Sequence, residues 1–396
     1  MQQLMGQYFR ELGEASRDAR RKVAWCTSVG PAELLRAMGF SVYFPENHGA
    51  MLGSSRAASS LIGAAHAVGY GPDVCSYLTS DVGAWLRDAT AVADLCSVAR
   101  VPVPDVLVYN TNQCRDVQDW FAFYQRQYNV PMFGIHTPRN LGEITGDVIS
   151  LIENQLRTLA KQLAPLAPER LDIDRLREVV ACSHQCSQAW NRVLRCAVHK
   201  PSPLTFFDGC IHMGPAVVLR GDARALQYYE TLHAELVERI DGNVAAVDDE
   251  RVRLYWEGMP IWGRLRDLAQ ALARQRSCVV ASTYCQSWVF DAFVLDDPFC
   301  AMATAYTELF IVRDDLFKQD YLARMAKRYD VDGFVFHDAK TCPNNSNCRY
   351  GMHHRLAEQL GLPCIVLSGD LNDLRMYSQE QAYTQLEALI EQVQRA

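Results

Sequence analysis

Short apolar runs alternate with amphipathic stretches along most of the chain. In the first part, segments with helical spacing, such as 32–38 and 117–124, separate apolar runs at 22–26, 41–44, 106–109 and 132–135. Apolar runs that end in turn residues and lead into a helix are typical of a parallel sheet wound with helices. The pattern therefore predicts an N-terminal α/β lobe over residues 1–141.

A second lobe of the same kind is predicted at the other end, over residues 241–396, with strands at 253–256, 278–282, 333–337 and 364–367. Between the lobes, residues 142–240 carry apolar positions at helical spacing and predict a helical connector, interrupted by a loop at 205–214. The expected fold class is α/β, with two doubly wound Rossmann-like lobes. Open sheets of this kind bind ligands at the carboxyl ends of their strands, so we expect the site in the interlobe cleft.

Composition and charge narrow the class of protein. The chain has 396 residues, 49% of them hydrophobic, and a net charge of −7, which disfavours a nucleic-acid-binding surface. The first residues lack the apolar stretch of a signal peptide, and no later run reaches the ~18 apolar residues of a membrane span. We therefore expect a cytoplasmic enzyme that contacts neither membrane nor nucleic acid.

Fourteen cysteines are scattered singly, without the spacing of a secreted disulfide scaffold, which favours a reducing compartment. The sequence contains no C-x-x-C pair, no G-x-G-x-x-G fingerprint and no G-x-x-x-x-G-K-[ST] loop. A ferredoxin module and a standard dinucleotide site are thus disfavoured. Any ATP chemistry must come from another chain.

Three cysteines each lie in a loop that a strand-forming run is expected to bring to one cleft, and the loops of Cys114 and Cys342 are polar, so that a purely structural cysteine gains little burial there. They are Cys75, Cys114 in Asn-Thr-Asn-Gln-Cys-Arg-Asp, and Cys342 in Lys-Thr-Cys-Pro-Asn-Asn. Three thiolates can hold an iron–sulfur cluster and leave one iron open for substrate, while nearby amides tune its potential. Taken singly each cysteine is more often a buried apolar residue, and Cys26 and Cys348 are rival ligands.

A zinc site is the alternative for the last of these loops. One short segment contains several possible ligands, namely His337, Cys342, Cys348, His353 and His354. Their spacing matches no common zinc finger, however, and His353 and His354 are expected to begin an amphipathic helix.

Ser28, Glu46 and His48 are candidates for proton transfer. Ser28 follows the first predicted strand in a turn whose backbone N–H groups point outward, and Glu46 ends the next strand, so both could share one rim. The plain alternatives are a helix N-cap for Ser28 and loop roles for Glu46 and His48. Aromatic residues in 253–262 and 283–288 could line a pocket for a flat substrate or belong to the core.

Several segments resemble the family that joins benzoyl-CoA reductases with 2-hydroxyacyl-CoA dehydratases. The likeness covers nearly the whole chain and is most detailed for the B subunit of the ATP-dependent benzoyl-CoA reductase. It rests on Trp25-Cys-Thr-Ser-Val-Gly-Pro-Ala-Glu33, Phe44-Pro-Glu-Asn-His-Gly-Ala50, Cys75-Ser-Tyr-Leu-Thr-Ser-Asp-Val-Gly83, Asn110-Thr-Asn-Gln-Cys114, His337-Asp-Ala-Lys-Thr-Cys342, Ser368-Gly-Asp-Leu-Asn-Asp-Leu-Arg375 and Ser378-Gln-Glu-Gln381.

The resemblance implies that Cys75, Cys114 and Cys342 hold a [4Fe-4S] cluster, or a larger iron–sulfur cluster, and that Ser28 and Glu46 lie near the substrate. It implies a catalytic subunit that reduces the ring of benzoyl-CoA to a cyclic diene-carboxyl-CoA. The implied partners are a related second catalytic subunit and ATP-hydrolysing iron–sulfur subunits. The latter receive their electrons from reduced ferredoxin. The alternatives are a 2-hydroxyacyl-CoA dehydratase subunit and a non-catalytic scaffold that relays electrons.

Overall fold

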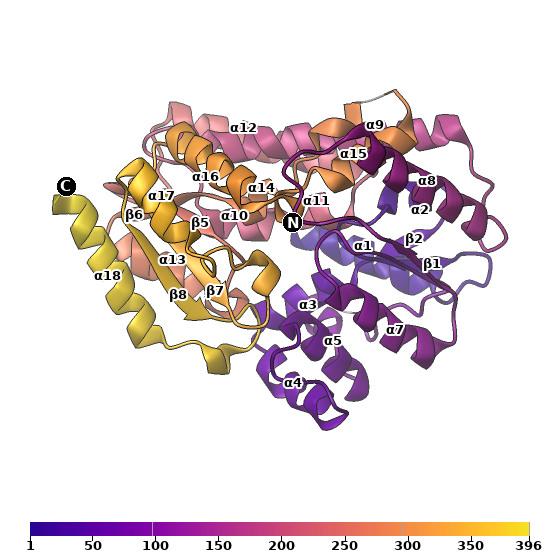
Figure 1. Cartoon of the computed structure of the whole chain (residues 1–396). Coiled ribbons are helices and arrows are strands. Elements are labelled where there is room, and N and C mark those ends of the chain that lie inside the picture. Colours follow the sequence, from indigo (N-terminus) through magenta and orange to yellow (C-terminus); the bar gives the residue numbers. More distant parts are fainter. Residues whose placement is uncertain (97, 295, 396) are drawn as a thin grey trace.

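Two four-stranded parallel sheets organise the protein, one in each half of the sequence. The computed structural model describes residues 1–96, 98–294 and 296–395. Figure 1 shows the N-terminal half (indigo to purple) beside the C-terminal half (orange to yellow), each with helices around its sheet. We call these halves the N-terminal lobe and the C-terminal lobe. The predicted α/β class with two wound sheets is confirmed.

The N-terminal sheet has the strand order β2-β1-β3-β4, and every neighbouring pair is parallel. Its two central strands, β1 and β3, are buried along their whole length, which explains why they read as continuous apolar runs. All four predicted strands are confirmed within a residue at each end: β1 (Val23–Cys26), β2 (Ser41–Tyr43), β3 (Val106–Asn110) and β4 (Met132–Ile135).

The C-terminal sheet repeats this topology with the order β6-β5-β7-β8, again all parallel. Its four predicted strands are also confirmed: β5 (Val252–Glu257), β6 (Ser277–Ser282), β7 (Gly333–Ala339) and β8 (Cys364–Gly369). In each sheet the second strand lies on one side of the first strand, and the third strand lies on the other side of the first strand. The strand order therefore reverses between β1 and β3 and between β5 and β7, where wound sheets hold ligands.

Helices fill the crossovers and cover both sheets. The crossover from β2 to β3 is unusually long and contains the helices α3 to α6, of which α3, α4 and α5 are labelled at the bottom of Figure 1. In the lobes, the helices are α1 (Gln2–Ala15), α2 (Ala32–Ala37), α3 (Pro45–Ser54), α4 (Ala58–Ala67), α5 (Ser76–Leu86), α6 (Ala91–Cys96), α7 (Asp116–Tyr128), α13 (Leu265–Arg274), α14 (Thr283–Gln286), α15 (Pro298–Thr307), α16 (Asp315–Tyr329), α17 (Met352–Leu360) and α18 (Gln379–Arg395).

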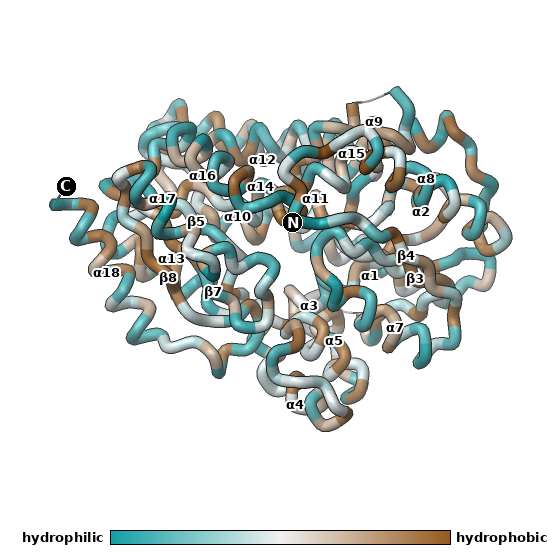
Figure 2. The backbone as a smooth tube through the Cα atoms, in the orientation of Figure 1, coloured by the Kyte–Doolittle hydropathy of each residue, from teal (hydrophilic) through white to brown (hydrophobic). Residues whose placement is uncertain are grey.

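The middle of the chain is helical, in α8 (Gly146–Leu163), α9 (Ile173–Arg195), α10 (Phe206–His212), α11 (Gly214–Val218) and α12 (Ala223–Asp241). Helix α12 packs along α9, and α15 from the later sequence packs against α8 and α9 at the top of Figure 1. In Figure 2 these long helices alternate between teal and brown, as expected of helices with one face in the core. The limits 142 and 240 of the connector stay a prediction.

The loop predicted at 205–214 is wrong, because helix α10 occupies most of it. Thr205 and Asp208 form a capping box: the backbone N–H of Asp208 donates to the Thr205 hydroxyl (3.2 Å), and that of Thr205 donates to the Asp208 carboxylate (3.0 Å). In the sequence, Pro201 and Pro203 stand just before Thr205 and indicate a loop, which hid this start signal. Within the described residues, no helix combines the length and apolar content needed to cross a membrane.

Candidate functional site

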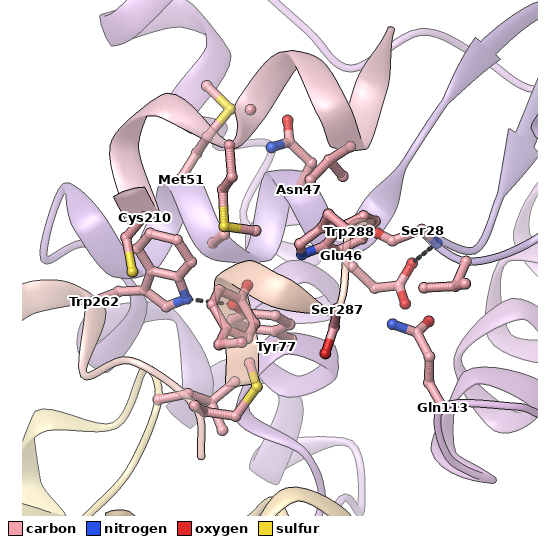
Figure 3. A pocket seen from close by; sticks show the side chains of 18 of the residues that line it. Ser28, Glu46, Asn47, Met51, Tyr77, Gln113, Cys210, Trp262, Ser287 and Trp288 are labelled. Carbon is pink, nitrogen blue, oxygen red and sulfur yellow. Dashed lines mark hydrogen bonds between the residues drawn. The ribbon is translucent and has the colours of Figure 1, made fainter. Parts of the chain in front are cut away.

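A cavity of about 630 Å³ lies where the two lobes meet, a volume within the usual range for ligand pockets. Its lining takes residues from the loops after all four central strands: Ser28 after β1, Cys114 after β3, Met259 after β5 and Cys342 after β7. These are the points of strand-order reversal in both sheets. Figure 3 shows part of this central cavity, with side chains from both lobes pointing into it.

The three cysteines predicted as ligands all line the central cavity, although they lie far apart in the sequence. Burial raises the pKa of the Cys114 and Cys342 thiols to about 12, and burial with the two neighbouring thiols raises that of Cys75 well above its usual range. Backbone N–H groups three residues later lower each pKa by hydrogen bonding, those of Leu78, Val117 and Asn345. Each cysteine thus stands at the start of a helical turn whose N–H group favours the thiolate.

This donor set fits an iron–sulfur cluster better than a single metal ion. Within the part of the chain that the structure describes, no three His, Cys, Asp or Glu side chains are grouped to hold one ion. A cubane presents different iron corners to different thiolates, so its ligands stand farther apart than those of one ion. Five described cysteines line the cavity, and of these Cys75, Cys114 and Cys342 each have a backbone N–H donor, which Cys96 and Cys210 do not. Three such thiols around an open cavity are suited to an iron–sulfur cluster.

The rival ligands and the zinc alternative find less support. Cys26 is fully buried in β1 and Cys348 is buried beyond the Cys342 loop, and neither belongs to the cavity lining. His337 is buried with its Nδ1 bonded to the Met259 carbonyl oxygen (2.6 Å), and His353 begins α17 as predicted. The zinc alternative also requires a group of ligands that the described residues do not provide.

Ser28 and Glu46 meet at the cavity wall. The backbone N–H of Ser28 donates a 2.5 Å hydrogen bond to Oε2 of Glu46, drawn as a dashed line in Figure 3. Burial raises the pKa of Glu46 to about 7, although the hydrogen bonds from Ser28 and the charge of Arg220 act in the opposite direction. A carboxyl with this pKa can give or take a proton near neutrality.

Two sequence expectations about this pair need correction. Glu46 does not end a strand: β2 ends at Tyr43, and Glu46 lies in the first turn of α3. Ser28 caps no helix, because α2 begins after Pro31 without a side-chain cap. The alternative role of Ser28 as a helix N-cap is therefore wrong.

His48 lies away from the cavity lining, in a buried polar cluster. Its Nδ1 is 2.5 Å from Oδ1 of Asp81, and its Nε2 is 2.8 Å from the Thr90 hydroxyl. Asp81 also accepts hydrogen bonds from Trp120 (2.9 Å) and Tyr124 (2.5 Å). Both ring nitrogens of His48 are thus engaged in anchoring α3 to its neighbours.

The aromatic segments divide between core and cavity. Trp256 is fully buried and stacks on Phe206 with centroids 5.3 Å apart, whereas Trp262, Tyr284 and Trp288 line the cavity. Tyr77 joins them from α5, and its hydroxyl accepts a hydrogen bond from the Trp262 indole across the lobes (Figure 3). These rings form the aromatic wall, defined as Tyr77, Trp262, Tyr284 and Trp288.

Three buried polar atoms of the lining find no hydrogen-bond partner among the described residues: Oδ1 of Asn47, Oε1 of Gln113 and Nε1 of Trp288. Buried polar groups are almost always paired, because an unpaired one costs about 1–3 kcal/mol. Unpaired acceptors and a donor gathered in one cavity are expected where a ligand completes the bonding. Of the described residues that line the cavity, none is Lys, Arg or His.

Comparison with known proteins assigns a family. Residues 27–393 match the family model described as 2-hydroxyglutaryl-CoA dehydratase, D-component. The chain belongs to this family. The lactoyl-CoA dehydratase subunit alpha of Anaerotignum propionicum is 28% identical and is matched over 98% of this chain and 95% of its own length.

Other relatives are named for different reactions on CoA thioesters. The (R)-2-hydroxyisocaproyl-CoA dehydratase alpha subunit of Clostridioides difficile is 28% identical over 95% of this chain and 91% of its own length. The B subunit of the benzoyl-CoA reductase of Thauera aromatica is 26% identical over 91% of this chain and 86% of its own length. The resemblance stated from the motifs is confirmed, since it joined these two groups in one family.

Sequence reasoning missed several cavity residues of this family member. Tyr77 lies in a quoted motif, and Gln113 precedes Cys114, yet neither carried a prediction. Met1, Met5 and Met51 also line the cavity, and no local signal distinguishes them from core methionines. Proximity to the predicted ligand loops was a usable signal for Tyr77 and Gln113.

Proposed function

We propose that the chain is the iron–sulfur catalytic subunit of an ATP-dependent benzoyl-CoA reductase. One observation carries the proposal: Cys75, Cys114 and Cys342 share a cavity with Glu46 and the aromatic wall. The thiols would hold a [4Fe-4S] cluster or a larger one, in a cleft between two lobes joined by residues 142–240. Such a cluster supplies single electrons at low potential.

The chain's own residues would position the substrate and exclude water. The aromatic wall offers flat apolar surfaces on which an aryl ring can stack. The indole N–H of Trp288, which has no partner among the described residues, can donate to a carbonyl oxygen. Glu46, buried and with its pKa raised to about 7, would hold a proton beside the ring.

The proposed partners follow from what the sequence lacks. Without a phosphate-binding G-x-x-x-x-G-K-[ST] loop or a C-x-x-C pair, ATP hydrolysis and electron delivery fall to other subunits. We propose a related second catalytic subunit and ATP-hydrolysing iron–sulfur subunits fed by reduced ferredoxin, in the cytoplasm. The relatives' names support an assembly, since each is called an alpha or B subunit.

Dehydration of a 2-hydroxyacyl-CoA is the second candidate function. The family description and two of the relatives above carry the word dehydratase. The Ser28–Glu46 pair suits this reaction as well, because a carboxylate near neutrality can remove a proton from the acyl chain. In that case the electron would be recycled, and the substrate would undergo no net reduction.

Anaerobic purification of the complete complex, followed by product analysis, tests both candidates. Iron and sulfide should copurify with the complex. Benzoyl-CoA should be converted only with ATP and reductant, and reductant should be consumed in proportion to product. Conversion of a 2-hydroxyacyl-CoA after a single priming reduction, with no activity on benzoyl-CoA, would favour dehydration. A complex without iron or sulfide would overturn the cluster in either form.

A further inference from the structure

Each pair of cysteine-bearing loops is tied together by one side chain that is not itself a cysteine. We define the loops as residues 71–76, 111–116 and 340–346, which contain Cys75, Cys114 and Cys342 respectively. The three tying side chains are Asp370, Asp116 and Arg139. Asp370 and Arg139 each make hydrogen bonds to two of the three loops, and Asp116, which is part of the Cys114 loop, bonds to the Cys75 loop. Together they connect the three loops pairwise.

Asp370 joins the Cys75 loop to the Cys342 loop. The residue is fully buried just after β8, in the segment Ser368-Gly-Asp-Leu-Asn-Asp of the family motif. One carboxylate oxygen accepts from the hydroxyl of Ser76, and the other accepts from the backbone N–H (2.9 Å) and the hydroxyl (2.6 Å) of Thr341. The backbone N–H of Ser76 donates directly to the Thr341 hydroxyl (3.0 Å). The neighbours of two thiols are thus held on one carboxylate.

Asp116 joins the Cys114 loop to the Cys75 loop. It stands in the first turn of α7, two positions after Cys114, and its Oδ2 accepts the backbone N–H of Cys75 at 3.2 Å. This bond reaches the backbone of the second cysteine itself. Asp116 therefore couples the position of one thiol to the helix that follows another.

Arg139 closes the third side, between the Cys114 loop and the Cys342 loop. Its guanidinium donates to the carbonyl oxygens of Asn112 (3.0 Å) and Gln113 and to the side-chain oxygen of Asn344 (3.3 Å). It also donates to the carbonyl of Ile311 (3.3 Å), in the later sequence. The planar fork of arginine can serve several acceptors at once, which lysine cannot do with the same geometry.

We propose that Asp116, Asp370 and Arg139 form a frame that fixes the separations among the three cysteine loops for cluster binding. The proposal rests on the proposed function, since it assigns these residues to the cluster named there. The loops come from distant parts of the chain and from both lobes, so sequence proximity cannot hold their spacing. A rigid cluster requires definite sulfur–sulfur separations, and outer hydrogen bonds of this kind commonly tune metal affinity about 10–100-fold.

Asp370→Asn tests the frame with little change of volume. The amide replaces one acceptor oxygen with an NH₂ group, which then faces the donors of Ser76 or Thr341. Glu250→Gln is the matched control: its side chain is 4% exposed, and it accepts from Arg253 and from the backbone N–H of Ser202 (2.7 Å), outside all three loops. Both variants lose acceptors in a buried network, and only the first touches the ligand loops.

Arg139→Gln tests the third side, with Arg349→Gln as its control. Arg349 also donates to the backbone beside a cysteine, at the carbonyls of Ala339 (3.1 Å) and Lys340 (3.4 Å), but it serves that loop and strand β7 alone. The comparison therefore distinguishes an arginine that bridges two cysteine loops from one that supports a single loop.

Two measurements on the anaerobic complex decide the matter: the rate of iron release to an Fe²⁺ chelator, after subtraction of the iron released by the partner iron–sulfur subunits alone, and the melting temperature of the same complex. We expect Asp370→Asn and Arg139→Gln to release iron at least about tenfold faster than wild type. Glu250→Gln should lower the melting temperature with an unchanged release rate, and Arg349→Gln should remain within about threefold. If these residues served stability alone, all four variants would have a lower melting temperature, and their iron-release rates would not differ between the frame variants and the controls.

The outcomes separate the frame from the proposed function. Wild-type complex without iron and sulfide would overturn the proposed function, and the frame with it. Wild-type complex with a stable cluster, and Asp370→Asn and Arg139→Gln variants that release iron at the wild-type rate, would overturn the frame alone. Equal acceleration in the two controls would also overturn it.

Discussion

Glu46 accepts a hydrogen bond of 2.5 Å from the backbone N–H of Ser28, 18 positions earlier in the chain. The contact joins the loop after β1 to the first turn of α3, at the wall of the central cavity. The loop is itself held from behind, because the buried Arg220 donates to the carbonyl oxygens of Ser28 and Gly30 (2.9 Å) while paired with Glu33. The carboxyl that faces the cavity is thus fixed in place.

Glu46→Gln should slow turnover by about 10²–10⁴-fold, the usual contribution of a positioned acid or base, with little change in iron content. Glu257→Gln is a matched control, because Glu257 is also buried and burial raises its pKa to about 7 as well. Its oxygens are bonded to Thr283 and Asn347 (2.6 Å), and it is not part of the cavity lining. Single-turnover rates with iron measured on the same samples make the comparison; a Glu46→Gln rate within about twofold of wild type would exclude the role.

The rate should depend on pH with an apparent pKa near 7, the value to which burial raises Glu46. As a proton donor in ring reduction, Glu46 is active when protonated, so the rate should fall as pH rises through 7. As a base in dehydration it would act when ionised, and the rate would rise instead. Glu46→Gln should abolish this dependence of the rate on pH near 7, and Glu257→Gln should keep it.

The same shift predicts a dependence of stability on pH. A carboxyl whose pKa is raised from 4.5 to about 7 on folding binds its proton more tightly in the folded state. The free energy of unfolding therefore decreases as pH rises from about 4.5 to about 7, and the loss is complete above that range. Denaturant titrations at several pH values should show a flatter decrease in Glu257→Gln than in wild type.

Replacement of Cys75, Cys114 or Cys342 by Ser should each remove the cluster or leave a damaged one, because two thiolates hold a cuboidal cluster poorly. Cys196→Ser, Cys348→Ser and Cys364→Ser should keep the full iron content, since these cysteines do not line the cavity. Iron and sulfide analysis of anaerobic preparations is the test. Equal iron in all six variants would refute the ligand assignment.

The eight strands could be predicted from the sequence because each is a short, mainly apolar run between turn residues. Cys114 and Cys342 could be singled out because their loops are polar, which makes a purely structural thiol unexpected there. Asp370, by contrast, looks like a turn residue in the sequence. Asp370 acts through hydrogen bonds to Ser76 and Thr341, which lie 294 and 29 positions away. No local sequence pattern predicts contacts over such separations.

His48 illustrates the opposite failure. A histidine two residues from a candidate carboxylate is a natural proton carrier in a sequence. In the structure the helical turn points the two side chains in different directions, since positions two apart on a helix do not face each other. Glu46 reaches the cavity and His48 reaches Asp81. The start of helix α3, which the sequence did not predict here, decides their roles.

The cavity should bind acyl groups that carry a carboxylate more weakly than uncharged acyl groups. Since none of the described lining residues is Lys, Arg or His, a carboxylate at the end of the acyl chain would find no cationic side chain in the cavity wall. An uncompensated buried charge costs about 3–5 kcal/mol, or at least about 100-fold in affinity. Competition with benzoyl-CoA should therefore show 2-hydroxyglutaryl-CoA to bind at least about 100-fold more weakly, whichever of the two reactions the enzyme performs. Similar affinities would mean that a cation from a partner subunit completes the cavity.

Trp288→Phe should weaken substrate binding and leave the cluster intact. The indole ring lines the cavity and is 5% exposed, and its N–H has no partner among the described residues. Phenylalanine keeps an aromatic surface but removes the donor, so the loss should be that of one hydrogen bond, roughly three- to tenfold in affinity. Trp256→Phe is the control, because Trp256 does not line the cavity and its indole N–H already donates to the Met259 carbonyl (3.1 Å). That change should lower the melting temperature with little effect on affinity. If Trp288→Phe bound acyl-CoA as tightly as wild type, the substrate would take its hydrogen bonds elsewhere, with Asn47 and Gln113 as the remaining unpaired groups.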